Sequence, residues 1–312
     1  MSDAKVEDPR ANAQGRTPKR RRLSRKFGRS LVPWLYLLPA LVIFSWFKFY
    51  PMVLGFVMSF YDIQFYAPSE WVGLANFSRA FHDTQLMVAI GHTALYVIAE
   101  TFGAAIVAFF LAFALEGQAR HIRFIRTAIF LPAITSVAII AEIWRIFFNS
   151  AQYGLVNSFL DLLGIPAQGF LTDPDQALWV LILMSIWKNA PYNMVIFLAG
   201  LVSINRELYD AADVDGASLW RKIWHVTLPG IVPAISVVIM LSFIRGFRVF
   251  TEVYATTGGG PAGSTSTIMT HIYKVGFEQI DYGYASAVSF MLLAFTVALT
   301  LLHTKIKSKF FG

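Results

Sequence analysis

Cysteine is absent from this 312-residue chain, and charged residues are scarce, at 14%. The absence of cysteine excludes disulfides, thiolate chemistry and cysteine-ligated metals. The charged share is well below that of soluble globular proteins, in which charged residues make up about a quarter. In their place, 56% of the residues are hydrophobic. The composition therefore predicts an integral membrane protein.

Signatures of catalysis and metal binding are also missing. The six histidines are scattered without metal-ligand spacing. The chain has no nucleophile elbow and no His-Glu-x-x-His run. The turn Gly258-Gly259-Gly260-Pro261 lacks the Gly-Lys-Ser/Thr that follows in a phosphate-binding loop. We therefore expect no enzyme activity, no catalytic residues, no metal site and no cofactor bound by this chain.

Long apolar sequence is what the chain has in abundance. Six stretches, at about 31–61, 86–115, 124–148, 176–202, 230–255 and 284–304, are long enough to cross a bilayer, which takes roughly 20 helical residues. Backbone groups cannot stay unpaired in lipid, so such stretches must be helices. The sequence predicts an all-α polytopic membrane protein with six transmembrane helices. Pro51 predicts a kink or a break in the first of these, close to the outer surface, and Pro132 predicts a kink in the third.

The distribution of basic residues predicts the orientation. Nineteen of the 26 Lys and Arg residues fall in residues 1–30, 116–126, 203–229 and after 304, whereas the intervening loops hold only Arg79 and Lys274. By the positive-inside rule both termini and the 203–229 connection are cytoplasmic. Topology thus explains the net charge of +7, and no nucleic-acid partner is expected.

The domain organisation is simple. Residues 1–29 are polar and basic, which predicts a disordered cytoplasmic tail near anionic lipid headgroups. Residues 30–312 form one transmembrane domain. On its outer face we expect the aromatic-rich stretch 61–85 to lie flat at the interface, and LVNSFLDLL at 155–163 to form an interfacial helix.

Charged side chains within spans are costly in hydrocarbon, so they face a cavity or a partner. Lys188 and Asn189 are candidates for a polar lining, and their neighbours Trp187 and Tyr192 either stack on sugar rings or pack against other helices. Further charged candidates, chosen on charge alone, are Arg245 and Glu252. For Glu142 and Arg145 we expect pairing with one another.

The most informative stretch is the connection between the fourth and fifth spans. Its length exceeds the two to eight residues that are usual between helices of a bundle. We expect two short helices separated by Gly216, which can adopt positive φ, with Leu219, Ile223 and Val226 forming one apolar stripe and Leu228-Pro229 ending the second helix. An amphipathic helix outside the membrane normally docks into a groove of another protein.

The run DAADVDGASLWRKIWHVTLP at 210–229 resembles the cytoplasmic coupling loop of inner-membrane permease subunits of binding-protein-dependent ABC importers. VGLANF at 72–77, WKNAPYNMVIFLAGL at 187–201 and VFTEVYATTGGGP at 249–261 resemble the carbohydrate branch, on the side of the maltose-type first permease subunit. The resemblance covers almost everything from about residue 30 onward. One departure is Asp210, where the family most often has Glu.

The resemblance implies an importer subunit of the bacterial inner membrane. It implies a heterodimer with a second permease, two ATPase subunits that bind ATP and Mg, an extracytoplasmic solute-binding protein and a carbohydrate substrate. The coupling loop would span 204–229 and rest in an ATPase cleft. The residues expected to couple to the ATPase are Asp210, Ala211, Ala212, Asp215, Gly216, Ala217, Leu219, Ile223 and Pro229.

Substrate contacts are implied for the spans on either side of this loop. Matched to the family's motifs, the positions are Ser185, Lys188 and Asn189 in one span and the region of Arg248 and Val249 in the next. A neutral oligosaccharide is favoured, while an acidic oligosaccharide or a glycerol or sugar phosphate is the alternative. The rival function is an ion-coupled secondary transporter, which would want internal repeats and a membrane-buried ion site. A membrane enzyme is a more distant rival.

Overall fold

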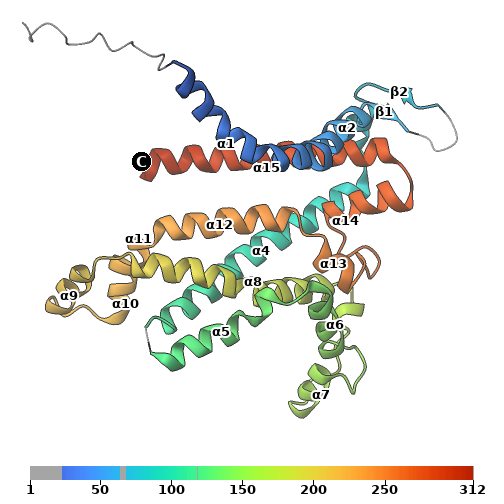
Figure 1. Cartoon of the computed structure of the whole chain (residues 1–312). Coiled ribbons are helices and arrows are strands. Elements are labelled where there is room, and N and C mark those ends of the chain that lie inside the picture. Colours follow the sequence, from blue (N-terminus) through green and yellow to red (C-terminus); the bar gives the residue numbers. More distant parts are fainter. Residues whose placement is uncertain (1–22, 64–67, 118, 312) are drawn as a thin grey trace, which may run out of the picture. The chain divides into compact units, whose positions relative to one another are not determined.

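In the computed structural model, residues 23–63, 68–117 and 119–311 are described, and they are almost entirely helical (Figure 1). The first elements are α1 (Leu23–Phe44), the π-helical turn η1 (Ser45–Phe49), α2 (Tyr50–Met58), strands β1 (Tyr61–Asp62) and β2 (Glu70–Trp71), α3 (Ala75–Ala80), α4 (Thr84–Ala114), α5 (Arg120–Ile134), α6 (Val137–Phe147) and α7 (Leu155–Leu162).

The second half begins with the 3-10 turn η2 (Phe170–Thr172) and the long helix α8 (Ala177–Val202). The remaining elements are α9 (Arg206–Val214), α10 (Leu219–Lys222), the π-helical turn η3 (Ile223–Thr227), α11 (Leu228–Gly230), α12 (Val232–Phe247), α13 (Thr251–Thr256), α14 (Ile268–Tyr273), the π-helical turn η4 (Lys274–Glu278) and α15 (Tyr282–Phe311). The all-α prediction is confirmed, and α7 is the helix expected within 155–163.

The chain divides into two compact units, residues 1–54 and 55–312. The predicted tail at 1–29 lies mostly outside the described residues, but α1 begins at Leu23, before the expected start of the fold at Ser30. The first span, Pro33–Met58, runs through Pro51 without a break. The π-helical turn η1 ends just before Pro51, with the Tyr50 N–H donating to the Ser45 carbonyl. A single π turn inside a helix leaves the regular i→i−4 bonding pattern locally, so the helix can continue past a residue that lacks an N–H.

Four helices are long and apolar enough to span a membrane: Pro33–Met58, Thr84–Ala114, Ala177–Val202 and Tyr282–Lys307. Six spans result if each of two bent pairs counts as one, namely α5 with α6, bent by 96°, and the helix Leu219–Gly230 with α12, bent by 68°. The bend in the third predicted span therefore lies after Ile134 and not at Pro132, where the sequence predicted it. Thr135 and Ser136, just beyond it, adopt extended backbone conformations and turn the chain.

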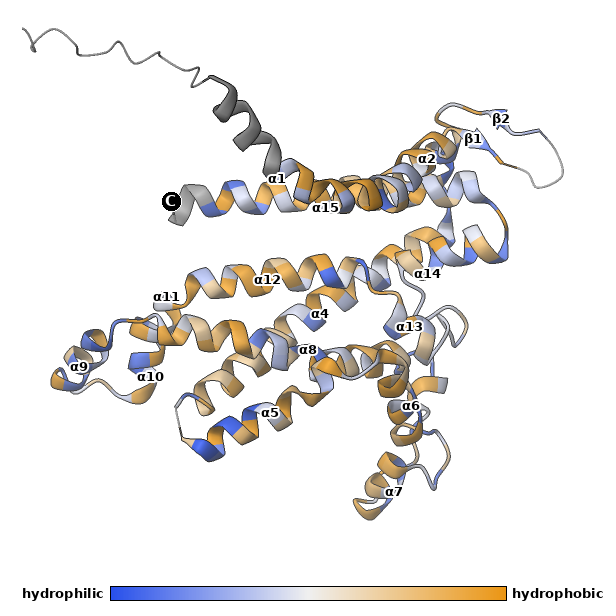
Figure 2. Cartoon of the chain, viewed as in Figure 1, coloured by the Kyte–Doolittle hydropathy of each residue, from blue (hydrophilic) through white to orange (hydrophobic). Residues whose placement is uncertain are grey.

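The core of the second unit is built on α4 and α8, which pack along their lengths, with α12 against both (Figure 1). One face of α4 carries small residues at helical spacing, and Ala104, Ala108 and Ala112 are fully buried. Small side chains let membrane helices approach closely, which gives dispersion contacts that lipid cannot replace. Figure 2 shows these helices largely apolar along their length.

The expected fifth span over 230–255 is wrong at its C-terminal end. Helix α12 ends at Phe247, and a non-helical segment, residues 248–250, precedes α13. Gly246 lies close to α4, where an added Cβ would sit 2.9 Å from Val97 Cγ2. The backbone of Phe250, at φ −134° and ψ −59°, is no longer helical. This break places α13 against α6 and α8 instead of continuing α12.

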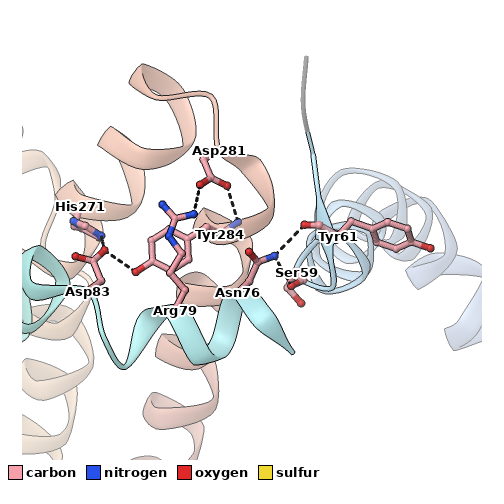
Figure 3. Close-up of polar contacts among 8 residues, drawn as sticks. All are labelled: Ser59, Tyr61, Asn76, Arg79, Asp83, His271, Asp281 and Tyr284. Atoms are coloured by element: carbon pink, nitrogen blue, oxygen red, sulfur yellow. Dashed lines mark hydrogen bonds and ion pairs between the residues drawn. The ribbon is translucent and has the colours of Figure 1, made fainter. Parts of the chain in front are cut away.

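The stretch after α2 forms an antiparallel hairpin followed by α3, which the sequence did not predict. Asn76, in the VGLANF motif, is buried and holds this region together: its Nδ2 donates to the carbonyls of Ser59 and Tyr61, both at 3.0 Å (Figure 3). Helix α15 packs against α3 at this point. Gly283 at its start leaves room for the Tyr61 carbonyl, because an added Cβ would lie 2.1 Å from that oxygen.

Candidate functional site

A polar cavity of about 280 Å³ lies between helices of the second unit. Four elements supply its walls: α4, α8, the C-terminal turn of α12 with the segment after it, and α13. The lining residues are Tyr96, Glu100, Lys188, Asn189, Ile244, Arg245, Gly246, Arg248, Val249 and Glu252. Five of these ten side chains carry a formal charge, which is costly inside a membrane protein and therefore points to function.

Polar contacts cross this cavity from helix to helix. Lys188 Nζ lies 2.7 Å from Glu252 Oε1, and the two side chains are 15% and 17% exposed. Asn189 Nδ2 donates to Glu100 Oε1 at 2.8 Å. Lys188 and Asn189, adjacent on α8, thus reach α13 and α4 respectively.

Arg245 makes the third polar contact between helices, from α12 to α8. Its Nη2 donates to Asn193 Oδ1 at 2.9 Å and to Ser242 Oγ at 3.0 Å, and its guanidinium lies 5.1 Å from the ring centroid of Tyr192. Within the described part of the chain, the guanidinium of the exposed Arg248 has no hydrogen bond or ion pair. Glu100 Oε2 is buried there without a partner.

Six of the nine predicted substrate residues line the cavity: Lys188, Asn189, Arg245, Arg248, Val249 and Glu252. The other three do not. Ser185 is fully buried and accepts a hydrogen bond from the Tyr96 hydroxyl at 2.5 Å, and the Trp187 ring packs on Trp144 with centroids 6.1 Å apart. Trp187 and Tyr192 both remain partly exposed, at 44% and 47%, so the two roles left open for them, stacking on sugar rings and packing against helices, both stay predictions.

Sequence reasoning did not place Tyr96 or Glu100 in the site. A signal existed for Glu100, because a carboxylate within a span is a functional candidate by default. Tyr96 carried no such signal. The expected ion pair of Glu142 with Arg145 is present and confirmed.

The 204–229 loop follows α8 and precedes α12 (Figure 1). The cavity residues of α8, Lys188 and Asn189, lie near the middle of that helix, and those of α12 lie at its far, C-terminal turn. As predicted, two short helices, α9 and α10, flank Gly216, which has φ +68°. Lys222 pairs with Asp213 across them. Figure 2 shows their polar colouring against the apolar spans.

The predicted apolar stripe on this loop is wrong. Leu219 is 58% exposed, whereas Ile223 is 6% exposed and packs inside this chain. The two residues are one α-helical turn apart, with the Ile223 N–H donating to the Leu219 carbonyl, but Leu219 begins α10 at an exposed position whereas Ile223 packs against the rest of this chain. The π-helical turn η3 begins only at Ile223. The same turn lets the helix continue through Pro229 to Gly230, so Leu228-Pro229 does not end it as expected. Trp220 and Trp224, which the sequence analysis did not select, are both 64% exposed.

A second polar cluster joins α3 and α4 to α14 and α15 (Figure 3). Asp83 caps α4, accepting from the N–H groups of Gln85 and Leu86. It also accepts from the Tyr284 hydroxyl at 2.7 Å. His271 Nε2 lies 3.3 Å from Asp83 Oδ2, though not aligned for a hydrogen bond. Arg79 pairs with Asp281 at 2.6 Å beside them.

Two pKa values in this cluster are lowered. Burial lowers the pKa of the His271 imidazole below its ordinary 6.5, and the Asp83 carboxylate only partly opposes this. For Asp83 burial alone would raise the pKa, but the hydrogen bonds from Tyr284, Leu86 and Gln85 and the neighbouring His271 outweigh it, so the pKa falls below 3.8. The folded state therefore favours a neutral His271 beside an ionised Asp83.

Acidification is expected to weaken this cluster through His271. Because the folded pKa lies below 6.5, the stabilisation is complete above pH 6.5 and is lost as the pH falls through the folded pKa. Thermal unfolding of the purified complex should shift to lower temperature as the pH drops below 6.5, and His271→Gln should reduce that shift. His82→Gln, at an exposed position in the same region, is the control. An identical pH dependence in His271→Gln would contradict the assignment.

The family model described as "Binding-protein-dependent transport system inner membrane component" matches residues 28–311. Among curated relatives, the arabinooligosaccharides transport system permease protein AraP of Bacillus subtilis is 31% identical over 290 residues, covering 92% of this chain and 91% of AraP. The sn-glycerol-3-phosphate transport system permease protein UgpA of Yersinia enterocolitica is 32% identical over 282 residues, covering 89% of this chain and 94% of UgpA.

Among solved structures, a chain of a bacterial ABC transporter involved in import of the acidic polysaccharide alginate matches with a TM-score of 0.82 at 27% identity. That match covers 94% of this chain and 100% of the other. Relatives of this kind are transport subunits and not enzymes. With its several apolar helices, this chain is a multi-pass membrane protein. This chain accordingly belongs to the family of inner-membrane components of binding-protein-dependent transport systems.

Proposed function

We propose that this chain is a permease subunit of an ATP-driven importer and carries a sugar or oligosaccharide across the inner membrane by alternating access. One observation carries the proposal: a charged cavity lies within the helix bundle, and a polar two-helix loop connects α8 and α12, two of the helices that line that cavity. Helices α8 and α12 join the two sites directly. A movement of the loop would therefore be transmitted mechanically to the cavity walls.

The loop is the proposed contact with an ATPase subunit. Its exposed members are available to a partner: Asp210, Ala211, Asp215, Gly216, Leu219 and Pro229. Ala212 and Ala217 are half-buried. Ile223, being buried, supports the loop from within, and the exposed rings of Trp220 and Trp224 join the proposed contact surface. ATP and Mg would bind to the ATPase, with no cofactor on this chain.

The remaining partners follow the family. We propose a second permease as the other half of a heterodimer, two ATPase subunits and an extracytoplasmic binding protein that delivers the substrate. Both chain termini and the loop would face the cytoplasm, as the excess of Lys and Arg in those connections favours.

The chemistry of the cavity leaves two substrate classes in competition. Amide, carboxylate and guanidinium groups on its walls suit the hydroxyl groups of a neutral oligosaccharide. The unpaired Arg248 favours an acidic saccharide or a phosphate ester, and the names of AraP, UgpA and the alginate transporter cover all these classes. We favour a neutral oligosaccharide, because the other two cations of the cavity already have partners in this chain.

Reconstitution tests the proposal. The complete complex with its binding protein would be placed in vesicles and offered arabinooligosaccharides, alginate oligosaccharides or glycerol 3-phosphate in parallel. We expect uptake of one class that requires ATP inside the vesicle and does not respond to an ion gradient. Uptake driven by an ion gradient without ATP would instead support a secondary transporter.

A further inference from the structure

The wall of the charged cavity includes one stretch of backbone that is not helical, residues 248–250 between α12 and α13. A helix holds its shape through its own hydrogen bonds, but a break of this kind must be held by its neighbours. Val249 is buried in the apolar cluster that includes Val253 of α13, and its carbonyl accepts from Thr267 Oγ1 at 3.2 Å. These contacts fix one side of the break.

The other side is held by charge. Glu252, in the first turn of α13, meets Lys188 of α8 at 2.7 Å, and both side chains are largely withdrawn from solvent. Because α8 is a continuous helix of 26 residues packed on α4, it is the rigid partner in this contact. The ion pair therefore ties α13 and the break that precedes it to this scaffold.

This contact also determines which cations remain available. Lys188 is neutralised by Glu252, and Arg245 is engaged by Asn193 and Ser242. Arg248 lies within the break itself, is exposed and lines the cavity. Holding α13 against α8 thus presents Arg248 to the cavity.

We propose that Lys188 and Glu252 are positioning residues, whose ion pair fixes the 248–250 break in the cavity wall, and that Arg248 is the cation that meets the substrate. The division of roles rests on the proposed transport function. It assigns Lys188 to the frame of the site, although a lysine in a transport cavity would ordinarily be taken for a substrate ligand.

A double-mutant cycle separates positioning from substrate contact. Removing one partner of a buried ion pair leaves the other charge uncompensated, whereas removing both leaves none. Lys188→Met and Glu252→Gln should each loosen the 248–250 segment. In the double variant this segment should be held more nearly as firmly as in the parent protein than in either single variant. The charge-reversed double variant, Lys188→Glu with Glu252→Lys, should also restore the parental hold on this segment. Two independent substrate ligands would instead give losses that add.

The absence of cysteine from the chain provides a direct readout. Val249→Cys places one thiol in the break at a position only 5% exposed. In the purified complex, with substrate absent and labelling read on this subunit's band, a water-soluble maleimide should modify this thiol slowly. Each single charge variant should raise the rate at least tenfold, and the double neutral variant should return most of the way. Equal rates in all four proteins, or the fastest rate in the double variant, would overturn the proposal.

Arg248→Met is the matched comparison, since it removes a cation from the same wall without touching the ion pair. In the Val249→Cys protein that also carries Arg248→Met, the maleimide should modify the thiol at the parental rate. The KM for the transported saccharide should rise about tenfold or more, as expected for loss of a charge-assisted hydrogen bond. A large increase in labelling would show that Arg248 also holds the break and would overturn the division of roles. A complex that labels as expected yet moves no saccharide would contradict only the proposed function.

Discussion

Replacing Gly216 with valine is expected to reduce the binding-protein-stimulated ATP hydrolysis of the assembled complex at least tenfold. The backbone at Gly216 has φ +68°, and nothing lies within 4 Å of an added Cβ. The cost is therefore conformational and not steric: an L-residue loses about 1–2 kcal/mol in this region, and a β-branched residue is especially disfavoured. The turn redirects the chain from α9 to α10 through hydrogen bonds from Gly216 N–H to Asp213 O and from Ala217 N–H to Ala212 O.

Gly216→Asn is the matched control. Asparagine tolerates the left-handed conformation better than other side-chain-bearing residues, and the open space accommodates it. We expect Gly216→Asn to keep most of the stimulation and both variants to insert normally into the membrane. If valine were as active as asparagine, the orientation of α10 set by this turn would not matter for coupling.

Gly283→Ala is expected to destabilise the second unit by an amount on the order of 3 kcal/mol, because it combines overpacking with the loss of buried hydrogen bonds. The new Cβ would lie 2.1 Å from the Tyr61 carbonyl oxygen and 3.2 Å from Asn76 Nδ2. A backbone oxygen cannot rotate away, so the hairpin must shift, and Asn76 would lose its two acceptors. Thermal unfolding and the yield of folded complex measure the effect.

Gly91→Ala provides the control for that experiment. Gly91 lies within α4 with no atom inside 4 Å of an added Cβ, so alanine should be neutral or slightly stabilising there through helix propensity. A Gly283→Ala protein as stable as Gly91→Ala would mean that α15 and the hairpin do not pack as closely as the structure has them.

Several features were predictable because their causes are local. Apolar runs define spans wherever they occur in the chain, since the bilayer sets the length and lipid forbids unpaired backbone. Glu142 and Arg145 lie three residues apart on one helix, so their pairing needs no knowledge of the fold. The turn at Gly216 likewise depends on its own residue and its immediate neighbours.

Predictions that assumed regular helices were the ones that failed. The predicted stripe treats Leu219 and Ile223 alike, but Ile223 is buried in this chain's own packing and Leu219 is not, and the π-helical turn η3 changes the helical period beyond Ile223. The bend after α5 occurs beyond Pro132, and the fifth span stops where its last turn meets α4. Proline and hydropathy patterns reveal where a helix can yield, but packing decides where it does.

That this chain is a helical membrane protein with a polar loop of two short helices could be predicted without a structure, because composition, span length and a single glycine turn are properties of neighbouring residues. Which side chains form the cavity could not. Lys188 and Glu252 are 64 residues apart, and Asn189 and Glu100 are 89 apart. Their meeting depends on how α4, α8 and α13 cross, and that crossing is set by the summed packing of small and apolar side chains along the helices.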